Sequence, residues 1–259
     1  MPDTNADLSQ FDLTGRTALI TGSSQGIGLA LAKGLANAGA AIVLNGRDQA
    51  KLELARKALA VLGSNAVSIA FDVTDHRAAR TAIDDYESTH GPIDICVNNA
   101  GMQHRGALEE FESAAFEKLL ATNISSVFNV GQAVARHMIK RGAGKVINIA
   151  SVQSSLARPS IAPYTATKGA VTNLTKGMAT DWAKYGLQCN AIAPGYISTD
   201  NTEALRNNPE RNESILARIP AGRWGQPEDF KGPIIFLCSE ASSYMHGGTM
   251  LVDGGWMGR

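Results

Sequence analysis

Short apolar segments alternate with longer amphipathic segments along the whole chain of 259 residues. The apolar segments are five to seven residues long and rich in Val, Ile, Leu and Ala, which is typical of strands buried on both faces of a sheet. They cover residues 17–21, 40–45, 66–71, 93–98, 145–150, 187–193 and 248–252. Strands separated by helices pair in parallel through right-handed crossovers. The pattern therefore predicts an α/β fold with one doubly wound, seven-stranded parallel sheet and helices on both faces.

No linker, repeat or low-complexity segment interrupts this alternation, so we expect a single domain over residues 1–259 with a short disordered or arm-like N-terminus at about residues 1–12. The longest break in the apolar pattern is residues 196–226, which are rich in Asn, Pro, Arg and Glu. One interpretation of this segment is a substrate lid over an active site. The other is a plain solvated insertion.

A glycine-rich turn follows the first predicted strand and precedes an amphipathic helix. Gly22, Gly26 and Gly28 have the spacing G-x-x-x-G-x-G within T-G-S-S-Q-G-I-G (21–28). The first glycine permits a tight exit from the strand, and the other two let a pyrophosphate group and the sheet approach the start of the helix. Free N–H groups at a helix start attract phosphate. Between a strand and a helix of an alternating chain, this turn predicts a dinucleotide-binding (Rossmann) site.

Three polar side chains indicate a proton-transfer site. Tyr164 and Lys168 are four residues apart, which places them on one face of a helix. A tyrosine has a pKa near ~10, so its phenolate can act as a base near neutral pH only if an adjacent charge such as an ammonium lowers that pKa. Ser151 follows the apolar run 145–150, at the carboxyl end of a predicted strand, where open sheets bind ligands. Tyr and Lys also occur at this spacing by chance, so the glycine turn is needed to favour catalysis.

The end of the second predicted strand bears on the choice of cofactor. An acid at this point holds the ribose 2′-hydroxyl of NAD, whereas a basic residue accommodates the 2′-phosphate of NADP. The run V-L-N-G-R-D (43–48) places Arg47 there, and a guanidinium pairs well with phosphate. We therefore expect NADP as the cofactor, with NAD less favoured. The alternative for Arg47 is a solvated residue at the start of a helix.

With these motifs, the chain resembles the short-chain dehydrogenase/reductase family in its shorter, single-domain form. The matching segments are T-G-S-S-Q-G-I-G (21–28), D-V-T (72–74), N-N-A-G (98–101), Asn123, Ser151, Tyr164, Lys168, and P-G (194–195) with Thr199. They cover nearly the whole chain in the family's order. The resemblance implies an oxidoreductase that uses NAD(P) to interconvert a secondary alcohol and a ketone.

The same resemblance implies roles for individual residues. The catalytic residues would be Asn123, Ser151, Tyr164 and Lys168. The cofactor would be bound by Tyr164 and Lys168 together with Gly22, Ser24, Gln25, Gly26, Ile27, Gly28, Arg47, Asp72, Val73, Asn98, Ala100, Gly101, Pro194, Gly195, Ile197 and Thr199. At Gln25 the chain departs from the many NADP-preferring members that carry a basic residue in this turn.

The resemblance implies distinct roles for Asp72, Asn98 and Asn123. Asp72 would touch the adenine ring and Asn98 would lie under the cofactor, although Asp72 could instead cap the following helix. Asn123 lies within a long helical stretch at about 113–141, where asparagine has a poor propensity. The resemblance implies that it holds a water linking Lys168 to solvent. Alternatively, its amide could bond a helix carbonyl.

Six stretches are also similar to the members of this family that act on gluconate. They are V-L-N-G-R (43–47), G-Q-A-V-A-R-H-M (131–138), L-A-R-P (156–159), I-A-P-Y-T-A-T-K-G-A (161–170), T-K-G-M-A-T-D-W (175–182) and P-A-G-R-W-G (220–225). The similarity implies D-gluconate and 5-keto-D-gluconate as the substrate pair. The alternatives are 3-oxoacyl thioesters or another polyol.

A sugar acid needs a cation for its carboxylate and polar partners for its hydroxyls. Polar side chains that flank the catalytic strand ends are Gln103, His104, Arg105, Gln153 and Ser155. The expected substrate-binding residues are Ser151, Gln153, Arg105 and Tyr164, with Arg105 as the carboxylate anchor. The alternative for Arg105 is a surface or subunit-contact arginine. His104 is a further polar partner or a structural histidine.

Composition argues against several other classes of protein. Lys and Arg number 24 and so do Asp and Glu, which gives no reason to expect nucleic acid or an anionic membrane as a partner. The cysteines, Cys96, Cys189 and Cys238, lie in apolar runs without metal-ligand spacing, so we expect reduced core residues and no metal site. No signal sequence or membrane-length apolar run is present, which predicts a cytoplasmic protein.

Two other function classes would leave different sequences. A lyase on the same scaffold that needs no cofactor would lack the glycine turn and carry an arginine at position 168, and a non-catalytic NADP-binding sensor would lack part of the catalytic set. The resemblance further implies a homotetramer, joined through helices at about 113–141 and 163–185. The apolar stripe Val171, Leu174, Met178 and Trp182 is explained equally well by packing on the sheet.

Overall fold

A computed structural model describes residues 8–258 and contains a seven-stranded sheet in the order β3-β2-β1-β4-β5-β6-β7. Every neighbouring pair of strands is parallel. The strands are β1 (Thr17–Ile20), β2 (Ala41–Gly46), β3 (Val67–Ala70), β4 (Ile95–Asn98), β5 (Gly144–Ile149), β6 (Leu187–Pro194) and β7 (Thr249–Val252). Each predicted apolar segment coincides with one of these strands, so the predicted doubly wound parallel sheet is confirmed.

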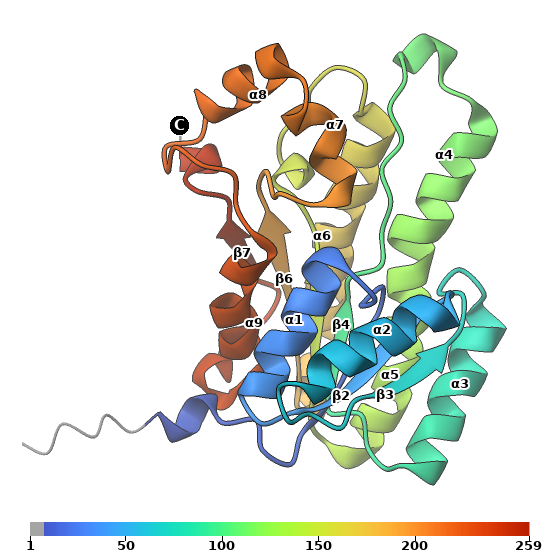
Figure 1. Ribbon diagram of the computed structural model, residues 1–259. Helices are drawn as coiled ribbons and strands as arrows, with labels where there is room; N and C mark the ends of the chain where they lie inside the picture. Colours follow the sequence, from blue (N-terminus) through green and yellow to red (C-terminus); the bar gives the residue numbers. More distant parts are fainter. Residues whose placement is uncertain (1–7, 259) are drawn as a thin grey trace, which may run out of the picture.

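Helices cover both faces of the sheet (Figure 1). They are α1 (Gly26–Asn37), α2 (Gln49–Ala60), α3 (His76–Thr89), α4 (Ser113–Leu120), α5 (Ser126–Arg141), α6 (Ala162–Trp182), α7 (Glu203–Arg206), α8 (Pro209–Leu216) and α9 (Lys231–Cys238). Successive strand residues face opposite sides, so Ala18 and Ile20 pack with α1, α2 and α9, whereas Leu19 packs with α3, α5 and α6. The sheet therefore separates two apolar cores.

The predicted helical stretch at 113–141 is interrupted by one π-helical turn, Ala121–Ser125, between α4 and α5. A π-helical turn accommodates an extra residue in the helix and often marks a functional site. Asn123 lies in this turn and is buried. The local break in regular hydrogen bonding explains how a residue of poor helical propensity is accommodated at this position.

The apolar stripe of α6 faces the sheet. Val171 and Met178 are buried in the core on this side, and Leu174 and Trp182 pack against it. Packing on the sheet therefore accounts for the stripe without a second subunit.

The predicted lid segment, residues 196–226, contains the short helices α7 and α8, which lie at the top of Figure 1. Its residues Ile215, Ile219 and Trp224 are buried in a small third cluster with Val152 and Trp256. A few buried residues therefore anchor the segment to the domain, while most of residues 200–223 are exposed.

The predicted N-terminal arm lies partly outside the described residues, because the structure describes the chain from residue 8. Its described part includes a 3-10 turn at Ser9–Phe11. Within residues 8–258, no helix combines the length and the apolar character needed to cross a membrane.

The close approach of α1 to the preceding turn gives a test of the fold. A Cβ atom added at Gly28 would collide with the carbonyl oxygen of Gly22 and lie 2.9 Å from the Cα atom of Ser23. We expect Gly28→Ala to lower the free energy of unfolding by about 1 to 3 kcal/mol, the usual cost of overpacking. Urea denaturation of the variant and the wild type measures this difference.

Gly232→Ala is the matched control, because this helical glycine of α9 has open space around its Cβ position. Alanine there should be neutral or stabilise by about 0.5 to 1 kcal/mol, since it reduces the conformational freedom of the unfolded chain. Equal destabilisation by both substitutions would show that the contact at Gly28 is unimportant.

Candidate active site

Strand β5 and helix α6 bring the three predicted proton-transfer residues together. Ser151 follows the end of β5, where its Oγ accepts a hydrogen bond from the Gln153 backbone N–H at 3.1 Å. Helix α6 begins at Ala162 with a proline in its first turn, which places Tyr164 near the helix start. One turn later, the Lys168 ammonium donates to the Ile149 carbonyl at 2.7 Å and lies 5.9 Å from the Tyr164 ring centroid. A hydroxyl, a phenol and an ammonium therefore meet at the carboxyl end of the sheet.

The electrostatics of Tyr164 involve two arginines besides Lys168. Burial raises the pKa of its phenol, and three neighbours oppose this shift: a hydrogen bond with Ser151 and the positive charges of Arg105 and Arg158. Burial also lowers the pKa of Lys168 to about 8. In this structure, the charges of two arginines thus favour the phenolate, in addition to the ammonium of Lys168 beside the ring. The sequence motif could not reveal this, because the arginines lie on separate loops.

Asn123 connects three elements of the site. Its Oδ1 accepts from the Met102 N–H at 2.8 Å, and its Nδ2 donates to the Met102 carbonyl at 2.9 Å and to the Thr167 hydroxyl at 3.0 Å. These partners lie on the loop after β4 and on α6, so the alternative of a bond to a carbonyl of its own helix is wrong. A Cβ atom at Gly101 would lie 3.4 Å from the Asn123 Oδ1 and 3.7 Å from the Lys168 Nζ. The Gly101 loop therefore adjoins both side chains.

The glycine turn has the geometry expected of a phosphate site. Gly22 and Gly26 have positive φ angles of 60° and 56°, which favour glycine. Helix α1 begins at Gly26, and the side chain of its N-cap residue Gln25 makes no capping bond and instead donates to the Asp200 carboxylate at 3.1 Å. The first N–H groups of α1 are thus left for an anion, which is the arrangement that binds a pyrophosphate. Ser24 and Ile27, both half-buried, flank this helix start.

Asn99, which was not predicted as a site residue, stabilises this turn through hydrogen bonds. Its Nδ2 donates to the carbonyls of Thr21 and Gly22 at 2.9 and 3.0 Å. The neighbouring Asn98 is buried, and its Nδ2 donates to Asn148 at 2.8 Å within the core. Any contact between Asn98 and a cofactor would therefore come from its backbone. Ala100 is held by the bond from its N–H to the Thr21 hydroxyl at 3.0 Å.

Arg47 lies at the end of β2 with its side chain 76% exposed, and its Nη1 is 3.5 Å from the Asp72 carboxylate. The adjacent acid, Asp48, caps α2 by accepting from the Lys51 N–H at 3.1 Å. Asp72 accepts from the N–H and hydroxyl of Thr74 and does not cap α3. That cap is Asp75, so the helix-cap alternative for Asp72 is wrong. Arg47 thus remains available at the strand end, between Asp72 and solvent.

The remaining predicted cofactor residues lie along two other strand ends. Val73 is buried just after β3, and Pro194 is the last residue of β6. Gly195 donates to the Val252 carbonyl at 3.0 Å, and Ile197 is buried. A Cβ atom at Gly26 would lie 4.0 Å from the Thr199 methyl group, so the start of the lid segment meets the glycine turn.

The polar residues expected to bind the substrate come from two segments, the loop after β4 and the segment after β5. Gln153 is buried, and its Oε1 has no hydrogen-bond partner among the described residues. Arg105 donates to the Gln103 side chain at 3.0 Å, and His104 packs edge-on against Phe111. Arg158 was not predicted from the sequence. The only signal for it was its position in L-A-R-P, which does not show that it faces Tyr164.

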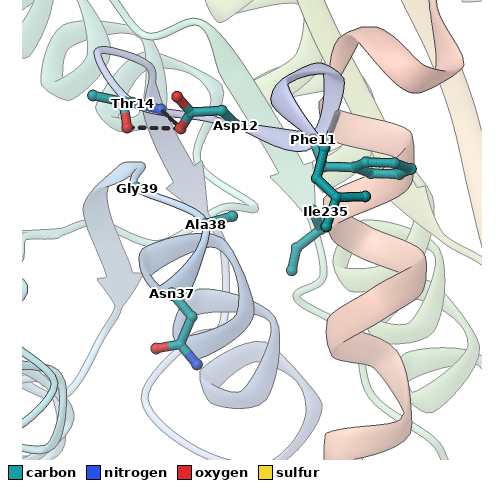
Figure 2. A pocket seen from close by; sticks show the side chains of 8 residues that line it. Phe11, Asp12, Thr14, Asn37, Ala38, Gly39 and Ile235 are labelled. Atoms are coloured by element: carbon teal, nitrogen blue, oxygen red, sulfur yellow. Dashed lines mark hydrogen bonds between the residues drawn. The ribbon is translucent and has the colours of Figure 1, made fainter. Parts of the chain in front are cut away.

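A surface pocket of about 440 Å³ lies away from these residues (Figure 2). It is lined by Leu8, Phe11, Asp12, Thr14, Asn37, Ala38, Gly39 and Ile235. These residues include the segments that enter β1 and β2, so the pocket adjoins the amino ends of the strands. The predicted catalytic and cofactor residues lie at the carboxyl ends. The polar cluster around Tyr164, and not this pocket, is therefore the candidate active site.

Known proteins are similar to this chain in sequence and in structure. A family model described as enoyl-(acyl carrier protein) reductase matches residues 22–257. Gluconate 5-dehydrogenase of Gluconobacter oxydans (strain 621H) is 55% identical over 245 residues, which are 95% of this chain and 96% of that protein. 2-Dehydro-3-deoxy-D-gluconate 5-dehydrogenase of Bacillus subtilis (strain 168) is 45% identical over 96% of this chain and 97% of that protein.

The comparison extends to solved structures. The crystal structure of a gluconate 5-dehydrogenase from Burkholderia cenocepacia J2315, in complex with NADP and tartrate, is 53% identical in sequence and superimposes with a TM-score of 0.94. The match covers 96% of this chain and 98% of that chain. Family model, sequence relatives and solved structure thus agree over nearly the whole length, and the chain belongs to the short-chain dehydrogenase/reductase family.

Proposed function

We propose that this protein is an NADP-dependent oxidoreductase that interconverts D-gluconate and 5-keto-D-gluconate. The observation that carries the proposal is the phenol of Tyr164, which shares a hydrogen bond with Ser151 and lies in the field of Arg105. A phenol of this kind can exchange a proton with a substrate hydroxyl, and a cation beside it suits an acidic substrate. The similarity to gluconate 5-dehydrogenases supports the substrate.

The residues around the glycine turn fit NADP. The uncapped start of α1 can receive the pyrophosphate, and the exposed Arg47 can pair with the 2′-phosphate. Asp48, the acid of that loop, is oriented toward the start of α2 by its bond from the Lys51 N–H. When bound, NADP supplies the acceptor of hydride in oxidation and, as NADPH, the donor in reduction.

The protein's own residues would handle the proton. In oxidation, the Tyr164 phenolate takes the proton of the substrate hydroxyl while the carbon-bound hydrogen leaves as hydride, and in reduction Tyr164 returns a proton to the oxygen. Ser151 would hydrogen-bond the same substrate oxygen. Lys168, fixed to the Ile149 carbonyl, would orient the nicotinamide ribose, and Asn123 would hold a water that connects Lys168 to solvent.

The substrate's other groups also have partners. Arg105 would anchor the carboxylate, and the unpaired Oε1 of Gln153 would accept from a substrate hydroxyl. The lid segment would close over the site, because Gln25 bonds Asp200 and Arg206 donates to the Thr199 carbonyl at 3.1 Å. The direct test is turnover of D-gluconate with NADP and of 5-keto-D-gluconate with NADPH by the purified protein. Efficient reduction of a 3-oxoacyl thioester instead would contradict the substrate.

We also propose that the protein is a homotetramer, in line with the family. Phe116 and Phe128, on α4 and α5, are 39% and 45% exposed, and Leu251 on β7 is 50% exposed. Large apolar side chains at the surface are suited to subunit contacts. Light scattering after size-exclusion chromatography measures the mass of the assembly.

Removal of the Tyr164 hydroxyl tests the proton transfer. Tyr164→Phe should lower turnover at least ~100-fold, because no other positioned group replaces the phenol, while NADP binding is largely kept. Steady-state kinetics and fluorescence titration with NADPH measure the two effects. Tyr244→Phe is the control, since that side chain is 97% exposed. Turnover retained by Tyr164→Phe at several pH values would mean that another group carries the proton.

A charge reversal at Arg47 tests the cofactor choice. Arg47→Asp should lower the ratio of kcat/KM for NADP to that for NAD by ~10- to 100-fold, because the lost pairing with phosphate is a charge-assisted hydrogen bond. The matched control is Lys57→Asp, the same reversal at a lysine of α2 that is 68% exposed. An unchanged ratio in Arg47→Asp would move the specificity to another residue.

A further inference from the structure

Two arginines without carboxylate partners lie close enough to Tyr164 for their charges to lower the pKa of its phenol. Among the described residues, no acidic group lies within 4.0 Å of Arg105 or Arg158. The two guanidinium groups repel each other, and each acts on Tyr164. Two like charges held together without a counter-ion lower stability unless an anion joins them. Arg105 is the carboxylate anchor of the proposed function, whereas Arg158 has no role in it.

The backbone holds the two arginines on adjoining loops. The N–H of Gly106, next to Arg105, donates to the carbonyl of Ser160 at 3.1 Å, so the loop after β4 is joined to the loop before α6. Ser160 has a φ of 70°, in the left-handed region that costs a non-glycine residue roughly 1 to 2 kcal/mol. The surrounding contacts maintain this strained conformation two residues after Arg158.

Arg158 lies over an aromatic cluster. Its guanidinium carbon lies 5.9 Å from the centre of the Tyr196 ring, and that ring contacts Trp224 and Trp256 with centroid distances of 5.6 and 4.6 Å. The Nε of Arg158 is buried and has no hydrogen-bond partner within residues 8–258. A buried donor without a partner is costly, so this position is suited to a ligand that brings an acceptor.

We propose, on the basis of the proposed function, that Arg158 is a second carboxylate-binding residue and that Arg105 and Arg158 form one anion site for the carboxylate of the sugar acid. This carboxylate is at the end of the carbon chain opposite to the reacting carbon, so the pair selects acidic substrates over neutral polyols of the same length. Two guanidinium groups can bind a carboxylate through several charge-assisted hydrogen bonds.

The positive charge of Arg158 also allows a second measurement of its role, the pH dependence of oxidation. Because Arg158 lowers the pKa of the Tyr164 phenol, its removal should raise that pKa. Oxidation needs the phenolate, so the rise of kcat/KM with pH should move to higher pH in Arg158→Gln. A merely structural role for Arg158 would not shift this limb of the profile.

The test uses the NADP-loaded protein and tartrate as an anionic probe that does not depend on turnover. By calorimetry, Arg158→Gln should bind tartrate ~10- to 100-fold more weakly than the wild type, and Arg158→Lys should retain part of the affinity. With NADPH, Arg158→Gln should raise KM for 5-keto-D-gluconate, while reduction of L-sorbose, in which a hydroxymethyl group replaces the carboxylate, should change little.

Arg218→Gln is the matched control. Arg218 also stacks on an aromatic ring of this cluster, 4.2 Å from the centre of Trp256, but it is not among the groups that shift the Tyr164 pKa. The control should bind tartrate like the wild type. Unchanged tartrate affinity in Arg158→Gln, or equal losses with 5-keto-D-gluconate and L-sorbose, would overturn the proposal. If Arg158→Gln does not fold, the same comparison in Arg158→Lys decides.

The substrate assignment and the anion site fail in different ways. If the wild type binds tartrate through both arginines but does not turn over gluconate, the proposed substrate is wrong and the anion site stands. If the wild type turns over gluconate and Arg105→Ala alone weakens tartrate binding, the substrate stands and the role of Arg158 is overturned.

Discussion

The hydrogen bond from the Lys168 ammonium to the Ile149 carbonyl holds helix α6 against the end of strand β5. The strand end carries Ser151 and the helix carries Tyr164, so this contact fixes the hydroxyl and the phenol relative to each other. Deeper in the core, Asn148 of β5 donates to the Thr175 hydroxyl of α6 at 2.9 Å, which is a second hydrogen bond between this strand and this helix. Because Asn123 also bonds Thr167, the loop after β4 is tied to the same helix. The candidate active site thus depends on the docking of α6.

The docking of α6 buries two ionisable side chains, Tyr164 and Lys168, and burial shifts the pKa of both. Burial opposes charge on Lys168 and lowers its pKa to about 8, so its ammonium can lose a proton near neutral pH. Burial likewise opposes the Tyr164 phenolate, and Arg105 and Arg158 offset part of that penalty from loops outside the helix. The positive charges that favour the base are also the charges that suit an acidic substrate. Under the proposed function, acid–base chemistry and substrate charge are therefore coupled through the same two side chains.

The sequence predicted the sheet well because strands buried on both faces are short continuous apolar runs, as in residues 145–150. The glycine turn and the spacing of Tyr164 and Lys168 could also be predicted, because each is a motif of residues that are close together in the sequence. The π-helical turn at Ala121–Ser125 was not predicted, because the poor helical propensity of Asn123 does not distinguish a π-helical turn from an ordinary helix. Asp72 was considered as a possible cap of α3, but the cap is Asp75. The run D-V-T-D offers two candidates, and which one caps the helix depends on where the helix begins.

Arg158 could not be found from sequence because its role depends on three segments that are far apart along the chain. The Gly106 to Ser160 hydrogen bond joins the loop of Arg105 to its own, and Tyr196 of the lid segment provides the ring beneath it. A change in the conformation of residues 196–226 would therefore alter the position of the Arg158 charge as well as the access of solvent to the site. Under the proposed function, closure of residues 196–226 would be coupled to recognition of the carboxylate, since Tyr196, whose ring contacts Arg158, belongs to that segment.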